Sequence, residues 1–343
     1  MPNLPRHAFA LAVGAAGGGL FYLLHLPLPW MLGALFATMA AAVARAPVLA
    51  PDRMRPAVVA VIGVLLGSRF TPEVLTQAPA WAGTVTVLLA YVVAVALIVV
   101  PFYRYVGRLD WRTAYFAGMP GGLTEMIEIG EANGAQPAPI ILAHSLRIVV
   151  TIALIALWFR VVHGLGSGAA PAPHAALTLA DAALLLGCAG LGSLIGKPLR
   201  LPAPTFLGPL ILSAVLHLTG LTESTPPVLL VTVAQIILGT VLGCRFRGIS
   251  PATLARAGLL SLGATLLTLT LALGAGLVMR NISGVGVDQA MLALAPGGLT
   301  EMGLIAMAIQ SDVAFVALHH VARILFVLVI APPVFHLLAR RKG

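Results

Sequence analysis

The chain contains the same heptapeptide twice, and this duplication constrains its fold more than any other feature. Pro-Gly-Gly-Leu-Thr-Glu-Met occupies Pro120–Met126 and again Pro296–Met302, so the copies are offset by about half the length of the chain. Upstream, Gly67–Phe70 corresponds to Gly243–Phe246 at the same offset. A unit of about half the chain is therefore used twice, and each copy carries a helix-breaking motif.

The two copies define the expected domain organisation. We predict one repeat over residues 1–165 and a second over 177–343. The linker between them, 166–176, is rich in Gly, Ala and Pro and carries no Lys, Arg, Asp or Glu, which is typical of a loop.

Composition places the chain in the membrane. It is 59% hydrophobic and only 9% charged, whereas a soluble domain carries about 25% charged residues. Apolar runs such as Ala82–Val100 and Leu254–Val278 are long enough to cross a bilayer as helices. The net charge of +9 does not indicate nucleic-acid binding, because the basic residues cluster at the ends of apolar segments, where orientation signals occur.

Each half contains six apolar segments. In the first half they cover 8–25, 29–44, 56–70, 80–103, 112–133 and 138–162. In the second they cover 178–196, 204–220, 226–245, 254–279, 289–310 and 312–339. We predict an all-α integral membrane protein with about ten transmembrane helices plus two re-entrant or broken helices, the latter at 112–133 and 289–310.

The distribution of positive charge favours inverted over parallel repeats. With five crossings per half, fifteen of the 20 Lys and Arg residues lie on the cytoplasmic side, and only Arg69, Arg160 and Arg280 lie outside. Six crossings per half would make the repeats parallel and give a weaker asymmetry. Because cytoplasmic loops are enriched in Lys and Arg, we predict inverted repeats in a bacterial-type inner membrane, with both termini cytoplasmic.

The two Pro-Gly-Gly sequences are the predicted breaks. Gly121 and Gly122, like Gly297 and Gly298, follow a proline, which removes a backbone donor. A helix that restarts after such a break presents free N–H groups that favour an anion. Thr124 and Thr300 lie beside these groups and could add a hydroxyl. The alternative is a kinked helix that only packs on its neighbours.

Carboxylates follow both breaks. Glu125 and Glu301 occupy matched positions in the two copies, whereas Glu128 and Glu131 occur only in the first, and Glu128 lies on the same helical face as Glu125. A carboxylate at membrane depth is expensive and indicates function by default. It could carry a proton. The alternative is an ion pair with an intramembrane arginine that only holds the segment together.

A histidine and an arginine follow each break at a spacing of one helical turn. The pairs are His144 with Arg147 and His320 with Arg323. Arginine can hold a carboxylate bidentately, and histidine titrates near neutral pH. The alternative role is hydrogen bonding between helices.

No CxxC, HExxH, Walker or GxGxxG pattern is present, and we expect no enzyme activity, no cofactor and no metal site. The two cysteines, Cys188 and Cys244, lie in apolar stretches and are expected to be buried small residues.

The doubled heptapeptide with its downstream His-x-x-Arg resembles the AbrB membrane family, the "AbrB duplication" proteins. The resemblance covers essentially the whole chain. Members are often labelled ammonia monooxygenases or regulators of gene expression. In architecture alone the chain is similar, more distantly, to the cation–proton antiporter and anion transporter group, which implies inverted five-helix repeats with broken helices.

From these features we expect a secondary active transporter of a small organic anion, coupled to protons, with its site between the two breaks. Arg147 and Arg323 would bind the anion, and Glu125, Glu301, His144 and His320 would carry or gate the proton. The alternatives are a membrane sensor that regulates gene expression and a membrane-bound monooxygenase. The expected partners are the anion, protons and the lipid bilayer, with no nucleic acid. Homodimer formation stays open.

Overall fold

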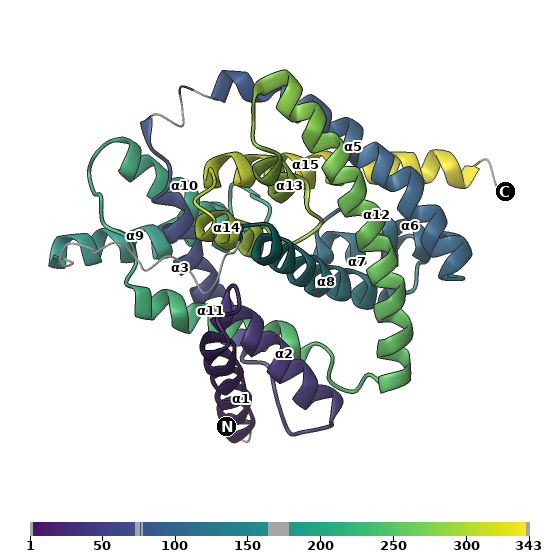
Figure 1. Ribbon diagram of the computed structural model, residues 1–343, viewed down its shortest axis with the longest axis horizontal. Helices are drawn as coiled ribbons and strands as arrows, with labels where there is room; N and C mark the ends of the chain where they lie inside the picture. The colour runs from purple at the N-terminus through teal and green to yellow at the C-terminus, as the bar shows by residue number, and fades with distance from the viewer. Residues whose placement is uncertain (1–2, 73–75, 77, 164–177, 341–343) are drawn as a thin grey trace. The chain divides into compact units, whose positions relative to one another are not determined.

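The computed structural model describes residues 3–72, 76, 78–163 and 178–340, and the regular elements in these ranges are all helical (Figure 1). Within these ranges, five helices are long and apolar enough to cross a bilayer: Trp81–Val106, Pro137–Val162, Leu179–Gly196, Pro251–Ser283 and Val313–Ala339. The predicted all-α membrane class is confirmed, while the count of ten crossings stays a prediction. The predicted linker at 166–176 lies outside the described residues.

The second half repeats the helices of the first in the same order. The first half contains α1 (Leu4–Leu23), α2 (Pro29–Val43), α3 (Arg55–Gly67), α5 (Trp81–Pro101), α6 (Trp111–Gly118), α7 (Leu123–Ala132) and α8 (Pro137–His163). The second contains α9 (Leu179–Gly196), α10 (Pro204–Leu218), α11 (Val228–Cys244), α12 (Pro251–Ser283), α13 (Val287–Leu294), α14 (Leu299–Ala308) and α15 (Val313–Arg340). Helices α6 and α7 precede α13 and α14 by the same offset that separates the two heptapeptides, so the sequence repeat is also a structural repeat.

Even unfavourable backbone conformations recur in the two halves. Leu28 and Ala203 occupy the same place in the matched sequences Leu-Pro-Leu-Pro and Leu-Pro-Ala-Pro. Both have left-handed conformations, with φ values of 47° and 49°, in a region that disfavours residues carrying a Cβ. Each residue is followed by a proline that opens a helix, where its fixed φ and missing N–H are tolerated. The same turn therefore introduces α2 and α10, although the residues at the strained position differ.

The chain folds into two compact units, and each draws on both halves. Unit 1 comprises Met1–Thr76, Ala153–Leu254 and Gly303–Ala314. Unit 2 comprises Gln77–Ile152, Ala255–Met302 and Phe315–Gly343. A compact unit is therefore not a sequence repeat. Both copies of the heptapeptide belong to unit 2.

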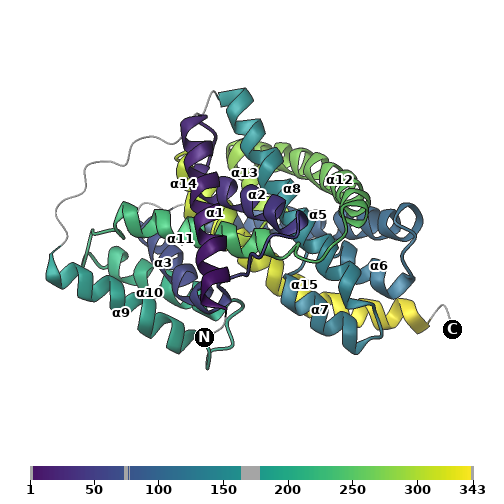
Figure 2. The same ribbon diagram turned by 90° about the horizontal axis from the view of Figure 1, so that it is seen from below.

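Unit 1 is built on close helix contacts at glycine. Helix α1 crosses α2 where Gly17 faces Gly33, and α9 crosses α10 where Gly192 faces Gly208 (Figure 2). A Cβ on any of these glycines would collide with backbone of the facing helix. Small residues allow membrane helices to approach in this way.

The halves also interlock within unit 1. Gly63 of α3 lies against the Phe206 carbonyl of α10, and Gly239 of α11 lies against the Met31 carbonyl of α2. These contacts are reciprocal under the repeat offset. Reciprocal contacts are what a pseudo-two-fold relation between two repeats produces.

Candidate functional site at two broken helices

Both Pro-Gly-Gly sequences interrupt a helix in unit 2. Helix α6 ends at Gly118, and α7 begins at Leu123, with extended backbone at Met119 and Gly122 between them. Helix α13 ends at Leu294 in the same way, and α14 starts at Leu299. These half-helices contain 8 or 10 residues, about 12 to 15 Å, which is too short to cross a bilayer alone.

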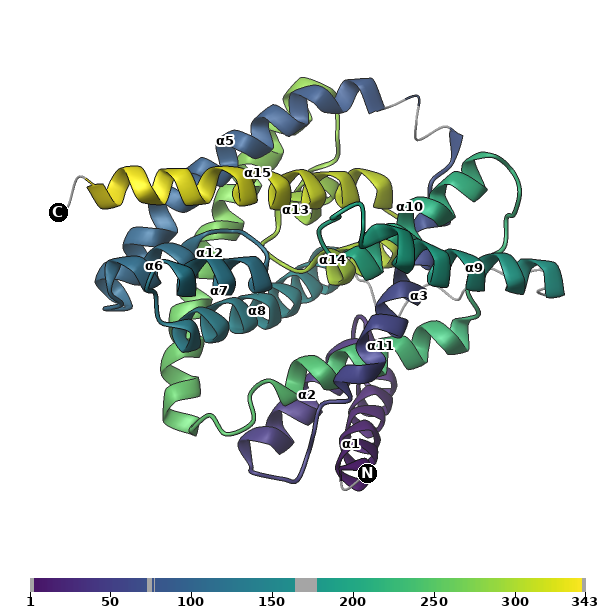
Figure 3. The same ribbon diagram turned by 180° about the vertical axis from the view of Figure 1, so that it is seen from behind.

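The arginine of α8 fills the gap that the first break leaves. Helices α6, α7 and α8 lie side by side (Figure 3). The Arg147 guanidinium donates from Nη1 to the Met119 carbonyl at 3.1 Å and from Nη2 to the Gly121 carbonyl at 3.3 Å. Breaking a helix frees carbonyls that hydrocarbon cannot satisfy. Arg147, which is buried, satisfies two of them.

His144 completes this contact one turn earlier on α8. Its Nε2 lies 2.9 Å from the Phe116 carbonyl, and its Nδ1 lies 3.0 Å from Nη2 of Arg147. A carbonyl only accepts and a guanidinium only donates, so the proton is assigned to Nε2 and the lone pair to Nδ1. His144 is therefore neutral and has both ring nitrogens engaged, a geometry that suits a structural link better than a proton carrier.

The second break has the same set of contacts. Arg323 donates to the carbonyls of Ala295 and, at 3.2 Å, Gly297, and its Nη2 lies 3.0 Å from Nδ1 of His320. His320 Nε2 lies 2.9 Å from the Leu292 carbonyl. The three carbonyls are the repeat counterparts of Met119, Gly121 and Phe116.

We call each set, His144–Arg147 and His320–Arg323, an Arg-His clamp. Each clamp places a positive charge at the C-terminal end of a half-helix, where the free carbonyls and the helix dipole favour cations. Each clamp also leaves one polar atom over, because Nε of Arg147 and Nε of Arg323 are buried with no hydrogen-bond partner among the described residues.

The carboxylates lie at the opposite, N-terminal ends. Glu125 is the third residue of α7, and its side chain folds back so that Oε2 occupies the space a Cβ on Gly122 would fill. Glu301 does the same over Gly298. Both glutamates take the third helical position, which is where the glutamate of a capping box is found. Each therefore puts a negative charge where free N–H groups favour one.

The remaining residues of the heptapeptide fit the same local packing. A Cβ on Gly121 would lie 2.9 Å from the Met126 sulfur, and a Cβ on Gly297 would lie 2.6 Å from Cε of Met302. In each copy, the first glycine of the motif therefore leaves room for the methionine side chain, and the second glycine leaves room for the glutamate side chain. The sequence did not indicate this role for methionine.

The sequence left open an ion pair between glutamate and arginine, and the contacts that define the clamps are with other partners. The hydrogen bonds of Arg147 and Arg323 go to carbonyl oxygens and to histidine. Glu125 is half-buried at the start of the other half-helix. The opposite charges thus serve opposite helix ends.

Tyr91 of α5 is a site residue that the sequence did not mark. Its hydroxyl donates to the Leu294 carbonyl at 3.0 Å, beside the second clamp. The repeat counterpart of Tyr91 is Leu267. An isolated tyrosine in an apolar segment offers no signal that distinguishes it from a core residue, because only the fold brings it to the break.

The other predicted residues differ between the copies. Thr124 and Glu128 are exposed, and Thr300 is half-buried. The counterpart of Glu128 is Leu304, which is fully buried. A carboxylate there would lose its hydration without gaining a partner, so the packing of α14 explains why the second copy lacks it.

Two further predictions concern residues outside the breaks. Cys188 and Cys244 are buried and free, as expected. Within the described part of the chain, no three His, Cys, Asp or Glu side chains come together as a metal shell would require.

Comparison with known proteins identifies relatives over almost the whole chain. Residues 30–339 match the family model described as "Transition state regulatory protein AbrB". "Uncharacterized protein YhjN" of Bacillus subtilis (strain 168) is 24% identical over 372 residues, covering 99% of this chain and 95% of the relative. "Putative regulator AbrB" of Escherichia coli (strain K12) is 26% identical over 324 residues, covering 92% and 91%.

Proposed function

Because this chain belongs to the AbrB family and breaks two helices at a duplicated motif, we propose a function from the geometry of those breaks. The protein is a secondary active transporter of a small organic anion, coupled to protons. It acts in a bacterial-type inner membrane with both termini in the cytoplasm. The observation that carries the proposal is the folding of Glu125 and Glu301 back over the N-termini of α7 and α14.

In this mechanism the protein's own carboxylate competes with the substrate. While Glu125 is ionised, it occupies the N-terminal end of α7 and offsets the helix dipole there. Protonation removes that charge and weakens the attraction. The carboxylate of a substrate can then take the place against the free N–H groups. Each anion bound thus requires a proton taken up, which is the linkage that proton-coupled anion transport needs.

The Arg-His clamps have a framework role in this proposal. Each arginine donates hydrogen bonds from Nη1 and Nη2 to backbone carbonyls and to the histidine of its clamp. The Nε of each arginine is buried with no hydrogen-bond partner among the described residues, and the Tyr91 hydroxyl is engaged by the Leu294 carbonyl. The proton role therefore narrows to Glu125 and Glu301, since His144 and His320 have both nitrogens engaged.

The test begins with ligand binding by the purified full-length protein. A panel of small mono- and dicarboxylates is screened by thermal shift at two pH values, with and without sodium. Compounds that stabilise the protein are then supplied as radiolabelled substrates to proteoliposomes under an imposed pH gradient. We expect uptake that rises with an inward proton gradient and does not need sodium. Binding without uptake would favour a sensor, and stabilisation by none of the carboxylates would contradict the proposal.

Glutamine substitutions locate the coupling group. Glu125→Gln mimics the protonated side chain, so anion binding should persist and lose most of its dependence on pH. Glu301→Gln tests the second site. Glu131→Gln is the matched control, because it removes the same charge from an exposed position of α7. If Glu125→Gln and Glu301→Gln both keep the wild-type pH profile, neither carboxylate is the coupling group.

A further inference from the structure

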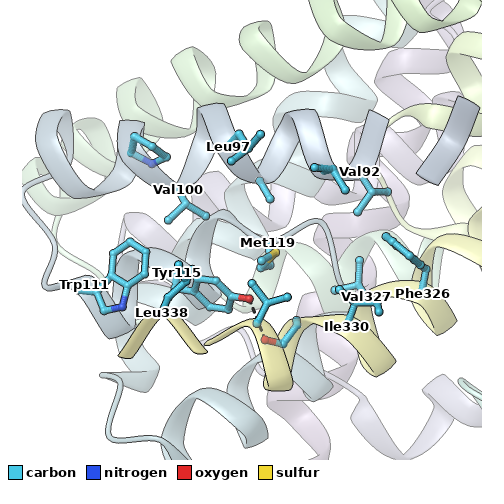
Figure 4. Close-up of a pocket in the computed structure, with 15 residues that line it drawn as sticks. Val92, Leu97, Val100, Trp111, Tyr115, Met119, Phe326, Val327, Ile330 and Leu338 are labelled. Atoms are coloured by element: carbon cyan, nitrogen blue, oxygen red, sulfur yellow. Dashed lines mark hydrogen bonds between the residues drawn. The ribbon is translucent and has the colours of Figure 1, made fainter. Parts of the chain in front are cut away.

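A lateral groove in unit 2 lies next to the first broken helix, and Met119, whose carbonyl Arg147 binds, forms part of its wall. It lies between α5, α6 and α15 and encloses a cavity of about 350 Å³ (Figure 4). Its walls are almost entirely apolar, with Ala96 and Leu97 on α5, Met119 just after α6 and Ile330 on α15 among the lining residues. The Tyr115 hydroxyl in the wall is satisfied, because it donates to the Ala331 carbonyl at 2.8 Å.

The groove opens toward the bilayer. Leu97 is 70% exposed, and Val93 and Ile330 are also exposed. All three lie in helices long and apolar enough to cross a membrane. An apolar hollow beside hydrocarbon fills with hydrocarbon, because an empty one forfeits dispersion contacts. In a membrane the available hydrocarbon is a lipid acyl chain.

One end of the groove has the features of a membrane interface. Trp111 and Leu338 lie at this end, and Val92 and Phe326 lie at the other (Figure 4). Trp111 is followed by Arg112, and Tyr105 in the preceding turn is 77% exposed. Tryptophan and tyrosine are enriched where helices leave the hydrocarbon, so this end lies at the level of lipid headgroups.

The same end is strongly cationic. Arg104, Arg108 and Arg112 are all exposed there. Arg104 donates to the Leu109 carbonyl at 2.7 Å, and Arg112 donates to the Asn133 carbonyl at 3.3 Å. These contacts use one nitrogen of each guanidinium and leave other donors for a phosphate.

The repeat counterpart of this end is not cationic. Arg104, Arg108 and Arg112 correspond to Arg280, Gly284 and Asp288. Gly284 and Arg108 share a left-handed backbone, with φ values of 72° and 55°. The first half therefore carries an arginine at a position where glycine would fit with less strain. The positive charge at this end is specific to the first half and is not a consequence of the duplicated fold.

We propose that the groove and its arginine cluster bind an anionic phospholipid. One acyl chain lies in the groove, and the phosphate headgroup meets Arg104, Arg108 and Arg112. Basic sites between transmembrane helices recognise anionic headgroups in this way. The site stands apart from the proposed transport function and does not depend on it.

The experiment measures lipid binding to the full-length protein in detergent. Dioleoylphosphatidylglycerol and dioleoylphosphatidylcholine, which share their acyl chains, are titrated and bound copies are counted by native mass spectrometry. We expect phosphatidylglycerol to bind at least about tenfold more tightly. Arg108→Gly with Arg112→Gln should lower its affinity toward that of phosphatidylcholine, at about fivefold per arginine. Ala96→Phe, which fills the groove, should weaken both lipids.

Arg280→Ser is the matched control, because it removes the repeat counterpart of Arg104 and should leave binding unchanged. Equal affinity for the two lipids, or an equal loss with Arg280→Ser, would overturn the proposal. If Ala96→Phe does not fold, a phosphatidylglycerol with a diazirine on its acyl chain replaces it. Crosslinks to the groove faces of α5, α6 and α15 support the site, and crosslinks confined to other helices overturn it.

Discussion

At the scale of single residues, each clamp binds the backbone carbonyls that a helix break leaves free, and these bonds hold the arginine charge in a fixed position. Arg147 and Arg323 are buried, but each is bonded to carbonyls that the breaks leave free. Losing either arginine would strand those carbonyls and a histidine nitrogen together. Buried groups left unsatisfied cost about 1–3 kcal/mol each.

We therefore expect the substitutions Arg147→Gln and Glu125→Gln to act independently on stability. Arg147→Gln should destabilise the protein by several kcal/mol, which is on the order of the cost of leaving two buried carbonyls without hydrogen bonds. Glu125→Gln should cost much less, because glutamine is also favoured at the third position of a helix. The double variant should show the sum of both effects, because the two side chains serve different helix ends. Unfolding in detergent for all four proteins gives the answer, and recovery in the double variant would reveal an ion pair.

Sequence reasoning at this scale identified the residues but not their partners. The spacing of His144 and Arg147 indicated one helix face, and that prediction holds because spacing along a helix is a local property. That both side chains bind backbone at the end of α6 depends on where the break places free carbonyls, which is a tertiary property. Tyr91 was missed for the same reason.

At the scale of elements, helix α6 begins with a cap that titrates. Asp110 accepts from the Thr113 backbone N–H at 3.0 Å. Partial burial acts to raise the pKa of Asp110, but its hydrogen bonds, chiefly with Thr113, outweigh burial and hold the pKa below its usual value. A lowered pKa means that the stabilisation is present above the unfolded-state pKa and is lost as pH falls through the folded-state value.

Asp110→Ala should therefore destabilise the protein by about 1 kcal/mol at neutral pH. The difference in the free energy of unfolding between Asp110→Ala and wild type should shrink as the pH falls below the usual pKa of an aspartate. Asp110→Asn keeps a capping side chain without a titrating group. The pH dependence of its stability should therefore lack the contribution of the Asp110 carboxyl. Thermal unfolding of the three proteins across pH tests this, and a wild-type advantage that grows on acidification would refute the cap.

The packing of α1 on α2 offers a second test of an element. Gly17→Ala places a methyl group against the Gly33 carbonyl and should cost about 1–3 kcal/mol. Gly19→Ala is the matched control on the same helix, where no atom of another described helix lies within 4 Å of the added carbon. Alanine there should be neutral or slightly stabilising, by up to about 1 kcal/mol. Equal melting temperatures for both variants would show that the close contact at Gly17 does not contribute to stability.

Element boundaries were predictable where the sequence carries a local stop. The predicted segment at 204–220 begins with α10 at Pro204, because proline opens a helix. The segment at 112–133 was predicted to be broken or re-entrant, and Pro-Gly-Gly does divide it into α6 and α7. Helix α12 extends to Ser283 beyond the predicted end at 279, since polar Arg280 and Asn281 carry no helix-stopping signal.

At the scale of the whole molecule, the duplication could be predicted and the two compact units could not. The offset between the two heptapeptides is visible in the sequence itself. The exchange of helices between halves depends on which surfaces match in space, as Gly63 matches the backbone at Phe206. A sequence of one chain records each glycine but not the helix that it faces.

The direction of the two repeats is the whole-molecule prediction that the charge distribution makes. In a background where Cys188 and Cys244 are replaced by alanine, Asn281→Cys and Lys197→Cys place one thiol each at exposed positions. Inverted repeats put Asn281 outside and Lys197 inside, whereas parallel repeats with six crossings per half exchange the two.

A membrane-impermeant maleimide applied to intact cells should therefore label Asn281→Cys and spare Lys197→Cys until the membrane is opened. The reverse pattern would establish parallel repeats. The loop at Lys197 would then lie outside while the cationic end of the lipid groove stayed in the cytoplasm, so the basic loops would no longer share one side.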